Sequence, residues 1–508
     1  MHNQEEPKIL FKSSSSRRMD LTTEIRIKIA TISLFFCIHG TITKLSQRYN
    51  ISRQFVYNLK TEFEDFYQLS EQKIESKLDT TLFYSYKMAL SLRMEGKCSI
   101  NSTSTIMRRL GISFSSVGSI SEHLKHVGQT LTNVISNADG VTFAIFASDE
   151  IYSKKRPILI TCDPVSFTIL HIKLCKSCTS KAWETEWERL KANGVIPLYI
   201  VKDEGTEMSC ASTKIFPDTK IQSDTYHAVS HKLGLWHIRL EAYAYKKIET
   251  EYEKERLLNN SKTEEIRIKR NLEYQTAKDK TVRALNNLDD FEFIYFNLLS
   301  CFELFDSNGN LKNKNHAIDK FKATLELGIE CLEYETLIKR LEAIFKIKDR
   351  LFYFYDIASD ILNGLKKETD TLILNFICLY WQTDKRWIKT KDSKIAKKIK
   401  IQEDNLLADI KELTDTKFEQ ALGKTLEKLN CIVQSSSAVE CINSILRPYL
   451  NTCKNQPTQE FLNLFMFYHN HRRFRAGKRK GRTPMEMFTG EIQSRDWLDL
   501  LMDKIEIE

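Results

Sequence analysis

Residues 141–174 read VTFAIFASDEIYSKKRPILITCDPVSFTILHIKL, and here the spacing of apolar residues changes from helical to strand-like. Three short runs rich in β-branched and aromatic residues stand at 141–150, 156–164 and 166–174. Turn-forming residues separate these runs. The pattern predicts a meander of three antiparallel strands.

The stretch after the meander predicts an α/β layer. SKAWETEWERLKANG at 180–194 has helical periodicity and closes on Gly194. VIPLYIVKDEG at 195–205 is a further strand, and KIQSD at 220–224 is a short one. Because a crossover helix returns the chain to the same sheet, the strand at 195–205 is expected to join the meander.

Long helical sequences follow this layer. Between Pro217 and Pro448 the chain has no proline and few glycines, and it is rich in Leu, Ile, Glu and Lys. This composition predicts an all-helical segment. Further helices are predicted at 435–450 and 459–470.

The size and composition of the chain limit its class. Its 508 residues are several times the length of a typical domain, so several packed cores are expected. No apolar run approaches the roughly 20 residues that cross a bilayer, and the start MHNQEEPK does not resemble a signal peptide. We therefore expect a cytoplasmic or nucleoid protein with no membrane partner. Its 12 cysteines are expected to be free thiols, and Cys175 and Cys178 lack the further ligands of a zinc site.

The segment TITKLSQRYNISRQFVYNLKTEF at 41–63 has two apolar-periodic stretches on either side of a short turn at Asn50 and Ile51. This is the pattern of a helix-turn-helix unit, whose second helix enters the major groove of DNA. An ordinary helical hairpin is the alternative. The residues expected to face DNA are Ser52, Arg53, Gln54, Tyr57 and Asn58, and those expected to pack inward are Ile51, Phe55, Val56 and Leu59.

A second candidate unit follows in STIMRRLGISFSSVGSISEHLK at 104–125. Gly111 stands in its turn, and Ser113 is expected to cap the following helix. Two candidates in tandem favour DNA binding over a structural role.

Two aspartates follow apolar strands. Asp149 comes after FAIFAS and Asp203 after PLYIVK, and strand ends at one edge of an α/β sheet are a common place for a site. Glu440 projects from the first turn of the helix that begins near Ser437 and is the natural third member. Each has an alternative: an Asp after a strand is common in turns, and Ser437 with Glu440 has the spacing of a capping box.

Three carboxylates in one site imply bound cations. Unless divalent ions neutralise them, they repel and raise one another's pKa. Oxygen ligands select Mg²⁺ or Mn²⁺, and two such ions about 4 Å apart can activate an attacking hydroxyl and stabilise the leaving oxygen of a phosphodiester. The expected chemistry is strand cutting or strand transfer.

Positive charge is concentrated near the C-terminus, in a chain with a net charge of +9. HRRFRAGKRKGR at 471–482 has seven Lys and Arg and no acid, which indicates phosphate contacts, although a merely solvated loop is the alternative. Thr483, Pro484 and Glu486 then predict a capped final helix. The basic residues expected to contact DNA are Arg472, Arg473, Arg475, Lys478, Arg479, Lys480 and Arg482.

Four stretches together resemble the DDE transposases of the RNase H-like, retroviral-integrase superfamily. They are FASDE, YIVKDEG, SSAVECINSILRPYL and FYHNHRRFRAGKRKGRTPMEMFTG, within about 140–227 and 430–490. The resemblance implies that Asp149, Asp203 and Glu440 form a metal-binding catalytic triad with two Mg²⁺ or Mn²⁺ ions.

The same resemblance implies further roles. Asn443 and Arg447 would face DNA from the helix that carries the Glu. Asp224 and His227 resemble an Asp-x-x-His element that supports the active site, although His227 is alternatively a core histidine. The Glu follows the second Asp by 237 positions, from 203 to 440, as in members with a large insertion.

The predicted fold class is multidomain α+β, with N-terminal helix-turn-helix units and an RNase H-like α/β catalytic core interrupted by a large all-α insertion. The predicted parts are a disordered leader at 1–20, helix-turn-helix units at 21–70 and 71–135, the core at 136–230 and 431–508, and the insertion at 231–430.

The predicted function is that of a DNA transposase that binds transposon ends and catalyses metal-dependent cleavage and strand transfer. Its partners would be double-stranded DNA of the ends and the target, and it would act as a homodimer or a larger assembly. Two alternatives stay open: a metal-dependent endonuclease that does not join strands, and an inactive transposase-derived DNA-binding regulator. The sequence contains no glycine-rich phosphate loop, so ATP or dinucleotide binding is not predicted.

Overall fold

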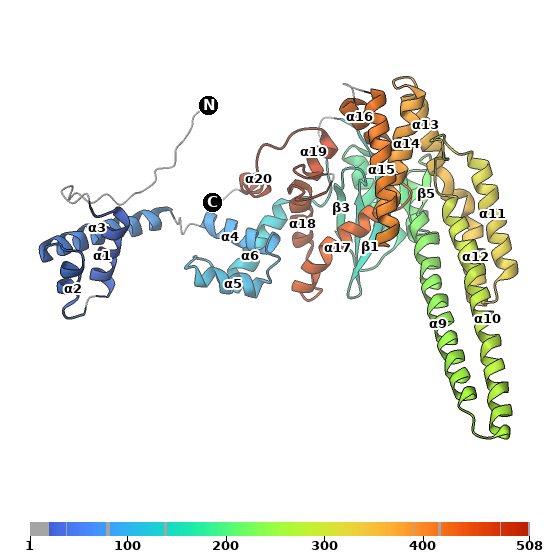
Figure 1. Cartoon of the computed structure of the whole chain (residues 1–508). Helices are drawn as coiled ribbons and strands as arrows, with labels where there is room; N and C mark the ends of the chain where they lie inside the picture. The colour runs from blue at the N-terminus through green and yellow to red at the C-terminus, as the bar shows by residue number, and fades with distance from the viewer. Residues whose placement is uncertain are drawn as a thin grey trace. The chain divides into compact units, whose positions relative to one another are not determined.

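The computed structural model describes residues 20–36, 38–77, 82–136, 140–390, 392–414, 418–477 and 479–505. The leader predicted at 1–20 lies, apart from Asp20, outside the described residues. The chain is mixed α/β, mostly helical, with one small sheet (Figure 1). It divides into two compact units, the first within 20–93 and 100–120 and the second comprising 94–99 and the residues from 121 onward.

The first unit begins with three helices around a small apolar core. Its helices are α1 (Thr23–Phe35), α2 (Thr41–Arg48), α3 (Arg53–Lys77), α4 (Leu82–Met94) and α5 (Ile100–Arg109). The helix α6 (Val117–Thr130) leads into the second unit. Ile29, Leu45, Val56 and Leu59 form the core of α1–α3 together with Ile51. Val56 and Leu59 are three residues apart, as are Ile42 and Leu45, so α2 and α3 each bury one face.

The cap predicted for α6 was placed three residues too early. Ser113 lies in the turn, where its carbonyl accepts a hydrogen bond from Ser85 Oγ at 2.8 Å. Ser116 caps the helix instead, because its Oγ accepts from the backbone N–H of Ser119 at 3.0 Å. Four serines within seven residues made the choice ambiguous, since each could cap a helix.

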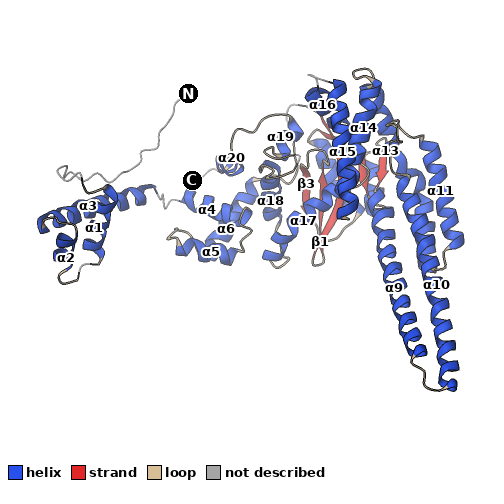
Figure 2. Ribbon diagram, in the orientation of Figure 1, coloured by secondary structure: helices blue, strands red, loops and turns tan. Residues whose placement is uncertain are grey.

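The second unit contains a five-stranded sheet with the order β3-β2-β1-β4-β5. Its strands are drawn in red in Figure 2. The strands are β1 (Thr142–Ser153), β2 (Arg156–Cys162), β3 (Ile169–Leu174), β4 (Val195–Lys202) and β5 (Ile221–Ser223). The first three pair antiparallel, and β4 pairs parallel with both β1 and β5. The predicted meander and crossover helix are therefore confirmed.

Helices cover both faces of the sheet. On one face α7 (Ser180–Ala192) buries Trp183 and Trp187, and Trp187 Nε1 donates to Thr161 Oγ1, which is also 2.8 Å from Ser148 Oγ. Because side chains alternate along a strand, the neighbour of Ser148 on β1 faces the other side. That side contacts α17 (Ser437–Thr452), and α18 (Gln459–His471) contacts β3.

The first residue of the outer strand β3 is paired with a side chain. Asn470 of α18 accepts from the backbone N–H of Ile169 and donates to the carbonyl of the same residue, both at 2.9 Å. An unpaired strand edge would otherwise leave these groups open. The final helices are α19 (Pro484–Thr489) and α20 (Trp497–Lys504), and the capping box predicted for α19 at Thr483 and Glu486 is confirmed.

The segment between β5 and α17 is helical, as its composition predicted. The helix α8 (Thr206–Ile215) precedes β5. After it come a π-helical turn η1 (Tyr226–His231), α9 (Lys232–Asn259), α10 (Glu264–Ser300), α11 (Lys314–Cys331), α12 (Glu335–Ile347), η2 (Lys348–Phe352), α13 (Tyr353–Leu365), α14 (Thr371–Lys389), α15 (Ser393–Thr414) and α16 (Phe418–Asn430). Phe302, Phe321, Phe352 and Trp381 belong to one apolar core.

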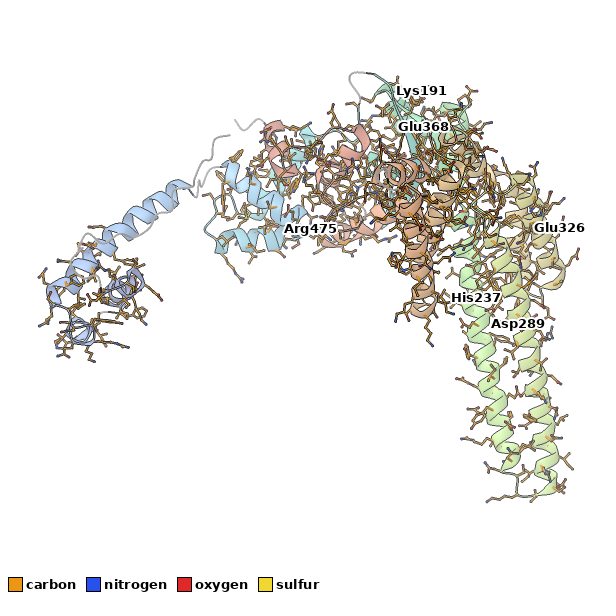
Figure 3. The ribbon with its side chains drawn as sticks, turned by 45° about the horizontal axis from the view of Figure 1, so that its top comes forward. Lys191, His237, Asp289, Glu326, Glu368 and Arg475 are labelled. Atoms are coloured by element: carbon orange, nitrogen blue, oxygen red, sulfur yellow. The ribbon has the colours of Figure 1, made fainter. Side chains whose placement is uncertain are left out.

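The helices α9 and α10 form a long hairpin within this segment. His237 and Asp289, which are labelled in Figure 3, mark its two arms, and His237 Nε2 lies 2.6 Å from Glu292 Oε1 of the facing helix. Over the described ranges, no helix is both long and apolar enough to cross a membrane.

Candidate active site

Asp149 lies on β1, and Asp203 directly follows the neighbouring parallel strand β4. Ala147 of β1 is paired with Val201 of β4, so the same register two residues on brings Asp149 level with Asp203. Asp203 directly follows β4, as predicted. Asp149 does not follow its strand: β1 continues to Ser153, since its antiparallel ladder with β2 extends beyond the end of β4. That prediction of a strand end was wrong, although the side chain still lies beside the end of β4.

Hydrogen bonds fix the loop that carries Asp203. Its Oδ1 accepts from the backbone N–H of Gly205 at 2.9 Å. The buried Lys202 donates through Nζ to the carbonyl of Asp203 at 3.1 Å and to Ser209 Oγ at 2.7 Å. Burial lowers the pKa of the Lys202 ammonium. Lys202 was not predicted from the sequence, although a single cation inside an apolar strand next to an acid is a recognisable signal.

Glu440 stands in the first turn of α17 and is partly exposed. The capping box that offered a structural explanation is absent: the N-cap is Ser436, and its side chain makes no capping hydrogen bond. Glu440 Oε1 instead lies 3.4 Å from His227 Nε2. His227 is half-buried and contacts an acid, so it is not an enclosed core histidine.

Asp224 connects the end of β5 to the start of α17. One carboxylate oxygen accepts from the backbone N–H of Ser436 at 2.8 Å and from its hydroxyl at 2.5 Å. The other accepts from the backbone N–H of His227 at 2.9 Å. Thr225 adds a backbone bond to Gln434 at 3.0 Å. These bonds position both the π-helical turn with His227 and the helix with Glu440, across more than 200 residues of intervening chain.

We expect Asp224→Ala to destabilise the second unit. The change leaves two buried backbone N–H groups and one hydroxyl without their acceptor, and each unsatisfied group costs about 1–3 kcal/mol. The melting midpoint should fall by about 5–10 °C. Asp218→Ala, at an exposed acid after α8, is the control and should leave the midpoint unchanged. Equal midpoints for both variants would show that the Asp224 bonds do not stabilise the site.

The acids of the site interact electrostatically. Burial raises the pKa of Asp149 to about 8, and Glu440, Glu150 and Asp203 add to this rise. Asn443 of α17 donates to Asp149 Oδ2 at 3.3 Å, while its own Oδ1 is buried without a hydrogen-bond partner. A bound cation would favour the ionised form of Asp149, and Oδ1 of Asn443 could coordinate it.

The donors match a hard divalent cation, since they are carboxylate and amide oxygens. As placed, however, the described residues include no group of three or more His, Cys, Asp and Glu side chains positioned to hold a metal ion. Glu440 and Asp203 each act electrostatically on Asp149, but the three acids do not form a complete ligand set as placed.

The raised pKa of Asp149 predicts a pH-dependent stability in metal-free buffer. The folded state keeps this proton to about pH 8, whereas the unfolded chain loses it near pH 4. Between these values the folded state binds more protons, so the free energy of unfolding decreases as the pH rises. Asp149→Asn removes the effect and should melt about 2–5 °C above the wild type near pH 8.5 in chelator. The difference should shrink toward pH 5; a difference that does not change with pH would contradict this.

The acids next to the two aspartates have other partners. Glu204 accepts from Ser223 Oγ and pairs with Arg350 Nη2 at 3.3 Å. Burial raises the pKa of Glu150, and the nearby Asp203 raises it further. Asp203 thus acts electrostatically on Glu150 as well as on Asp149.

The two residues of α17 that were predicted to face DNA differ in their exposure. Arg447 is exposed. Asn443 is almost completely buried, so the expectation that it faces DNA was wrong, and it contacts Asp149 instead. The spacing of 440 and 443 places both side chains on one helix face, but the sequence does not reveal that β1 covers residue 443.

The basic segment at 472–482 is only partly free. Arg473 Nη1 pairs with Glu486 Oε1 at 2.9 Å and donates to the carbonyl of Gly481 at 2.7 Å. Arg479 donates to the carbonyl of Val165 and lies over the ring of Phe167 at 4.2 Å. Lys478 lies outside the described residues. Arg472 is half-buried beside Tyr468. Arg473 is exposed despite its ion pair, and Arg475, Lys480 and Arg482 are exposed as well.

The helix-turn-helix candidate has the predicted burial pattern. Ile51, Val56 and Leu59 are buried, Phe55 is half-buried, and the residues expected to face DNA are exposed. Those residues are Ser52, Arg53, Gln54, Tyr57 and Asn58. Gln54 Nε2 donates to Asn58 Oδ1 at 3.0 Å, which orders one side of this face. Their contact with DNA stays a prediction.

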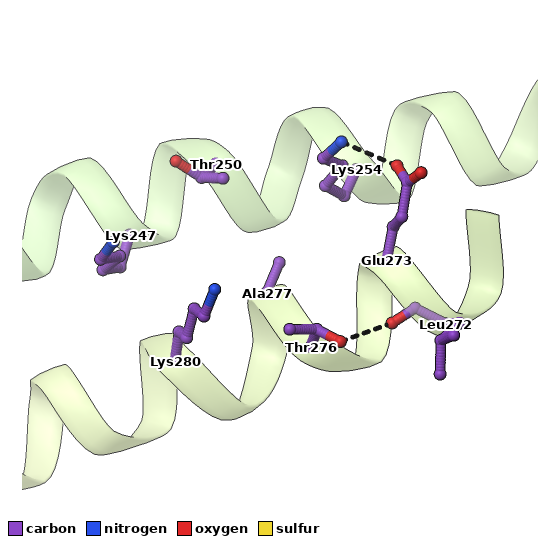
Figure 4. Close-up of a pocket in the computed structure, with 8 residues that line it drawn as sticks. All are labelled: Lys247, Thr250, Lys254, Leu272, Glu273, Thr276, Ala277 and Lys280. Atoms are coloured by element: carbon purple, nitrogen blue, oxygen red, sulfur yellow. Dashed lines mark hydrogen bonds and ion pairs between the residues drawn. The ribbon is translucent and has the colours of Figure 1, made fainter. Parts of the chain in front are cut away.

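A separate concavity lies between α9 and α10 (Figure 4). Lys247, Lys254 and Lys280 are among its lining residues, and Lys254 Nζ pairs with Glu273 Oε2 at 2.8 Å. No residue predicted for the active site lines it.

Comparisons with known proteins do not assign a family. Neither a protein-family model nor a curated protein sequence matches the chain.

Proposed function

We propose that the chain is a DNA transposase of the DDE type. In this proposal β1–β5 with α7, α8, α17 and α18 form an RNase H-like core, and α9–α16 are an insertion in it. The observation that carries the proposal is that Asp149 lies on β1 while Asp203 ends the adjacent parallel strand β4, with both Glu440 and Asp203 close enough to raise the pKa of Asp149.

The side chains of the site have distinct tasks in this proposal. Asp149, Asp203 and Glu440 would hold Mg²⁺ or Mn²⁺, which supplies activation of the attacking hydroxyl and stabilisation of the leaving oxygen when it is bound. Asn443 orients Asp149 through its hydrogen bond, and His227 holds Glu440. Asp149 must lose its proton before it can act as a ligand, because only the ionised carboxylate binds a cation well.

The remaining parts supply DNA binding. The exposed face of α3 with Arg53, Gln54, Tyr57 and Asn58 would recognise the ends of the element in the major groove. Arg447 and the free cations of the 472–482 segment would contact phosphates. Two copies or more would bridge two DNA ends, in keeping with the predicted homodimer or larger assembly.

A strand-joining assay tests the function. The protein is incubated with Mg²⁺, labelled DNA that contains the sequences flanking its own gene, and a circular target plasmid. We expect nicks at the ends followed by label covalently joined to the plasmid. Cutting without joining would show a nuclease, and specific binding without either product would show a DNA-binding regulator.

A further inference from the structure

The corner between α14 and α15 carries a high positive charge. From 385 to 400 the chain has eight Lys and Arg and one acid, Asp392. The basic residues are Lys385, Arg386, Lys389, Lys391, Lys394, Lys397, Lys398 and Lys400. The corner is far in sequence from both the helix-turn-helix candidate and the 472–482 segment.

Part of this charge is used within the protein. Arg386 Nη2 pairs with Glu303 Oε1 at 2.7 Å, and Lys400 Nζ pairs with Glu403 Oε2 at 3.0 Å. Lys385 Nζ lies over the ring of Trp381 at 3.5 Å. Lys391 and the side chain of Lys389 lie outside the part of the chain that the structure describes. The other three cations, Lys394, Lys397 and Lys398, are exposed, and no ion pair joins them to an acid in the described ranges.

These three lysines share one face of α15. Their spacing of three and four residues places them within about one turn, or 5.4 Å, of one another along the helix. They stand in its first turns, where the helix dipole opposes positive charge, and Lys394 and Lys398 repel at i,i+4. Asp392 already caps this end, since its Oδ1 accepts from the backbone N–H groups of Lys394 and Ile395. The lysines therefore do not stabilise the helix that carries them.

The other side of α15 faces the protein. Leu406 and Ile410 are buried, and Ile410 belongs to the apolar core of the helical segment. Lys400 Nζ lies 5.2 Å from the ring centre of Trp387, so the exposed indole at the end of α14 borders the basic face. Ile388, Ile395 and Ile401 are exposed at the same corner, so a bilayer is the alternative occupant. The spacing of the lysines and the DNA partner of the proposed function favour a duplex.

We infer that Lys394, Lys397 and Lys398 form a second DNA-binding surface that contacts the phosphates of a duplex. The inference rests on the proposed function, since DNA is the partner, and it gives the helical segment a role in holding DNA. A duplex presents one charge per about 1.7 Å of its axis, so three lysines within one helical turn can each face a phosphate.

The salt dependence of binding tests this inference. The full chain and the triple variant Lys394→Gln/Lys397→Gln/Lys398→Gln are titrated with a duplex of about 40 base pairs that lacks the element's ends. Each lost phosphate contact should reduce the slope of log affinity against log salt by about 0.9, so the variant should lose about 2–3 units of slope. The matched control, Lys246→Gln/Lys269→Gln/Lys278→Gln, removes three exposed lysines from α9 and α10, where acids offset them, and should keep the wild-type slope.

The outcomes separate this inference from the proposed function. If the wild type cuts and joins DNA while both triple variants keep its slope, the second surface is refuted and the transposase proposal stands. If the wild type binds no duplex, both fall. Loss of binding to phosphatidylserine vesicles with an unchanged DNA slope would assign the surface to a membrane and overturn the inference. An unchanged melting midpoint shows that the triple variant is folded.

Discussion

Asp203→Asn is expected to reduce DNA cleavage by about a thousandfold or more, because a metal-assisted site contributes several kcal/mol of transition-state stabilisation and 1.36 kcal/mol corresponds to tenfold in rate. The substitution keeps the size of the side chain and its acceptor for the N–H of Gly205, so the loop at the end of β4 should keep its conformation. DNA affinity should remain within a few-fold of the wild type.

The control for this variant is Asp218→Asn, which makes the same Asp-to-Asn substitution at an exposed acid after α8. It should cleave at the wild-type rate. Both variants are assayed for single-turnover cleavage of end DNA and for binding in chelator. Equal cleavage by Asp203→Asn and the wild type would remove Asp203 from the catalytic site, whereas joint loss of cleavage and binding would indicate misfolding.

Asn443→Ala is expected to raise the Mg²⁺ concentration needed for half-maximal cleavage by about 10- to 100-fold, the usual cost of removing a group that orients a metal ligand. The amide donates to Asp149 Oδ2, and its other atom is the unpartnered buried oxygen of the site. The maximal rate at saturating Mg²⁺ should be less affected than the half-maximal concentration.

Ser444→Ala is the matched control on the same helix, because Ser444 is exposed and its hydroxyl bonds only the local carbonyl of Cys441 among the described residues. It should show the wild-type Mg²⁺ dependence. If Asn443→Ala lowers the maximal rate and leaves the Mg²⁺ dependence unchanged, the side chain acts on DNA or on folding, and not through Asp149.

The sheet could be predicted because its strands differ in period and composition from everything around them. The runs at 141–150, 156–164 and 195–205 alternate or are continuously apolar, and turn residues bound them, so local sequence determines the element. The end of β1 could not be predicted in this way. Asp149 and Glu150 interrupt the apolar run, and only pairing with β2 shows that the strand continues to Ser153.

The acids proposed for the site could be chosen from the sequence, but their hydrogen-bond partners could not. An Asp after an apolar strand and a Glu in a first turn are local signals. The bonds of Asp224 to Ser436 and of Asn443 to Asp149 join residues 212 and 294 positions apart, and no local pattern encodes such contacts. The burial of Asn443 and the internal ion pair of Arg473 could not be predicted for the same reason, since both depend on which element packs against the residue.

Manganese binding measured by electron paramagnetic resonance tests the central claim most directly, because it detects the ions without requiring cleavage. The wild type in the presence of end DNA should bind two Mn²⁺ per chain, and Glu440→Gln should bind fewer and more weakly. Glu419→Gln, at an exposed acid on α16, is the control and should bind as the wild type does. Equal Mn²⁺ binding by Glu440→Gln and the wild type would contradict a site shared by Asp149, Asp203 and Glu440.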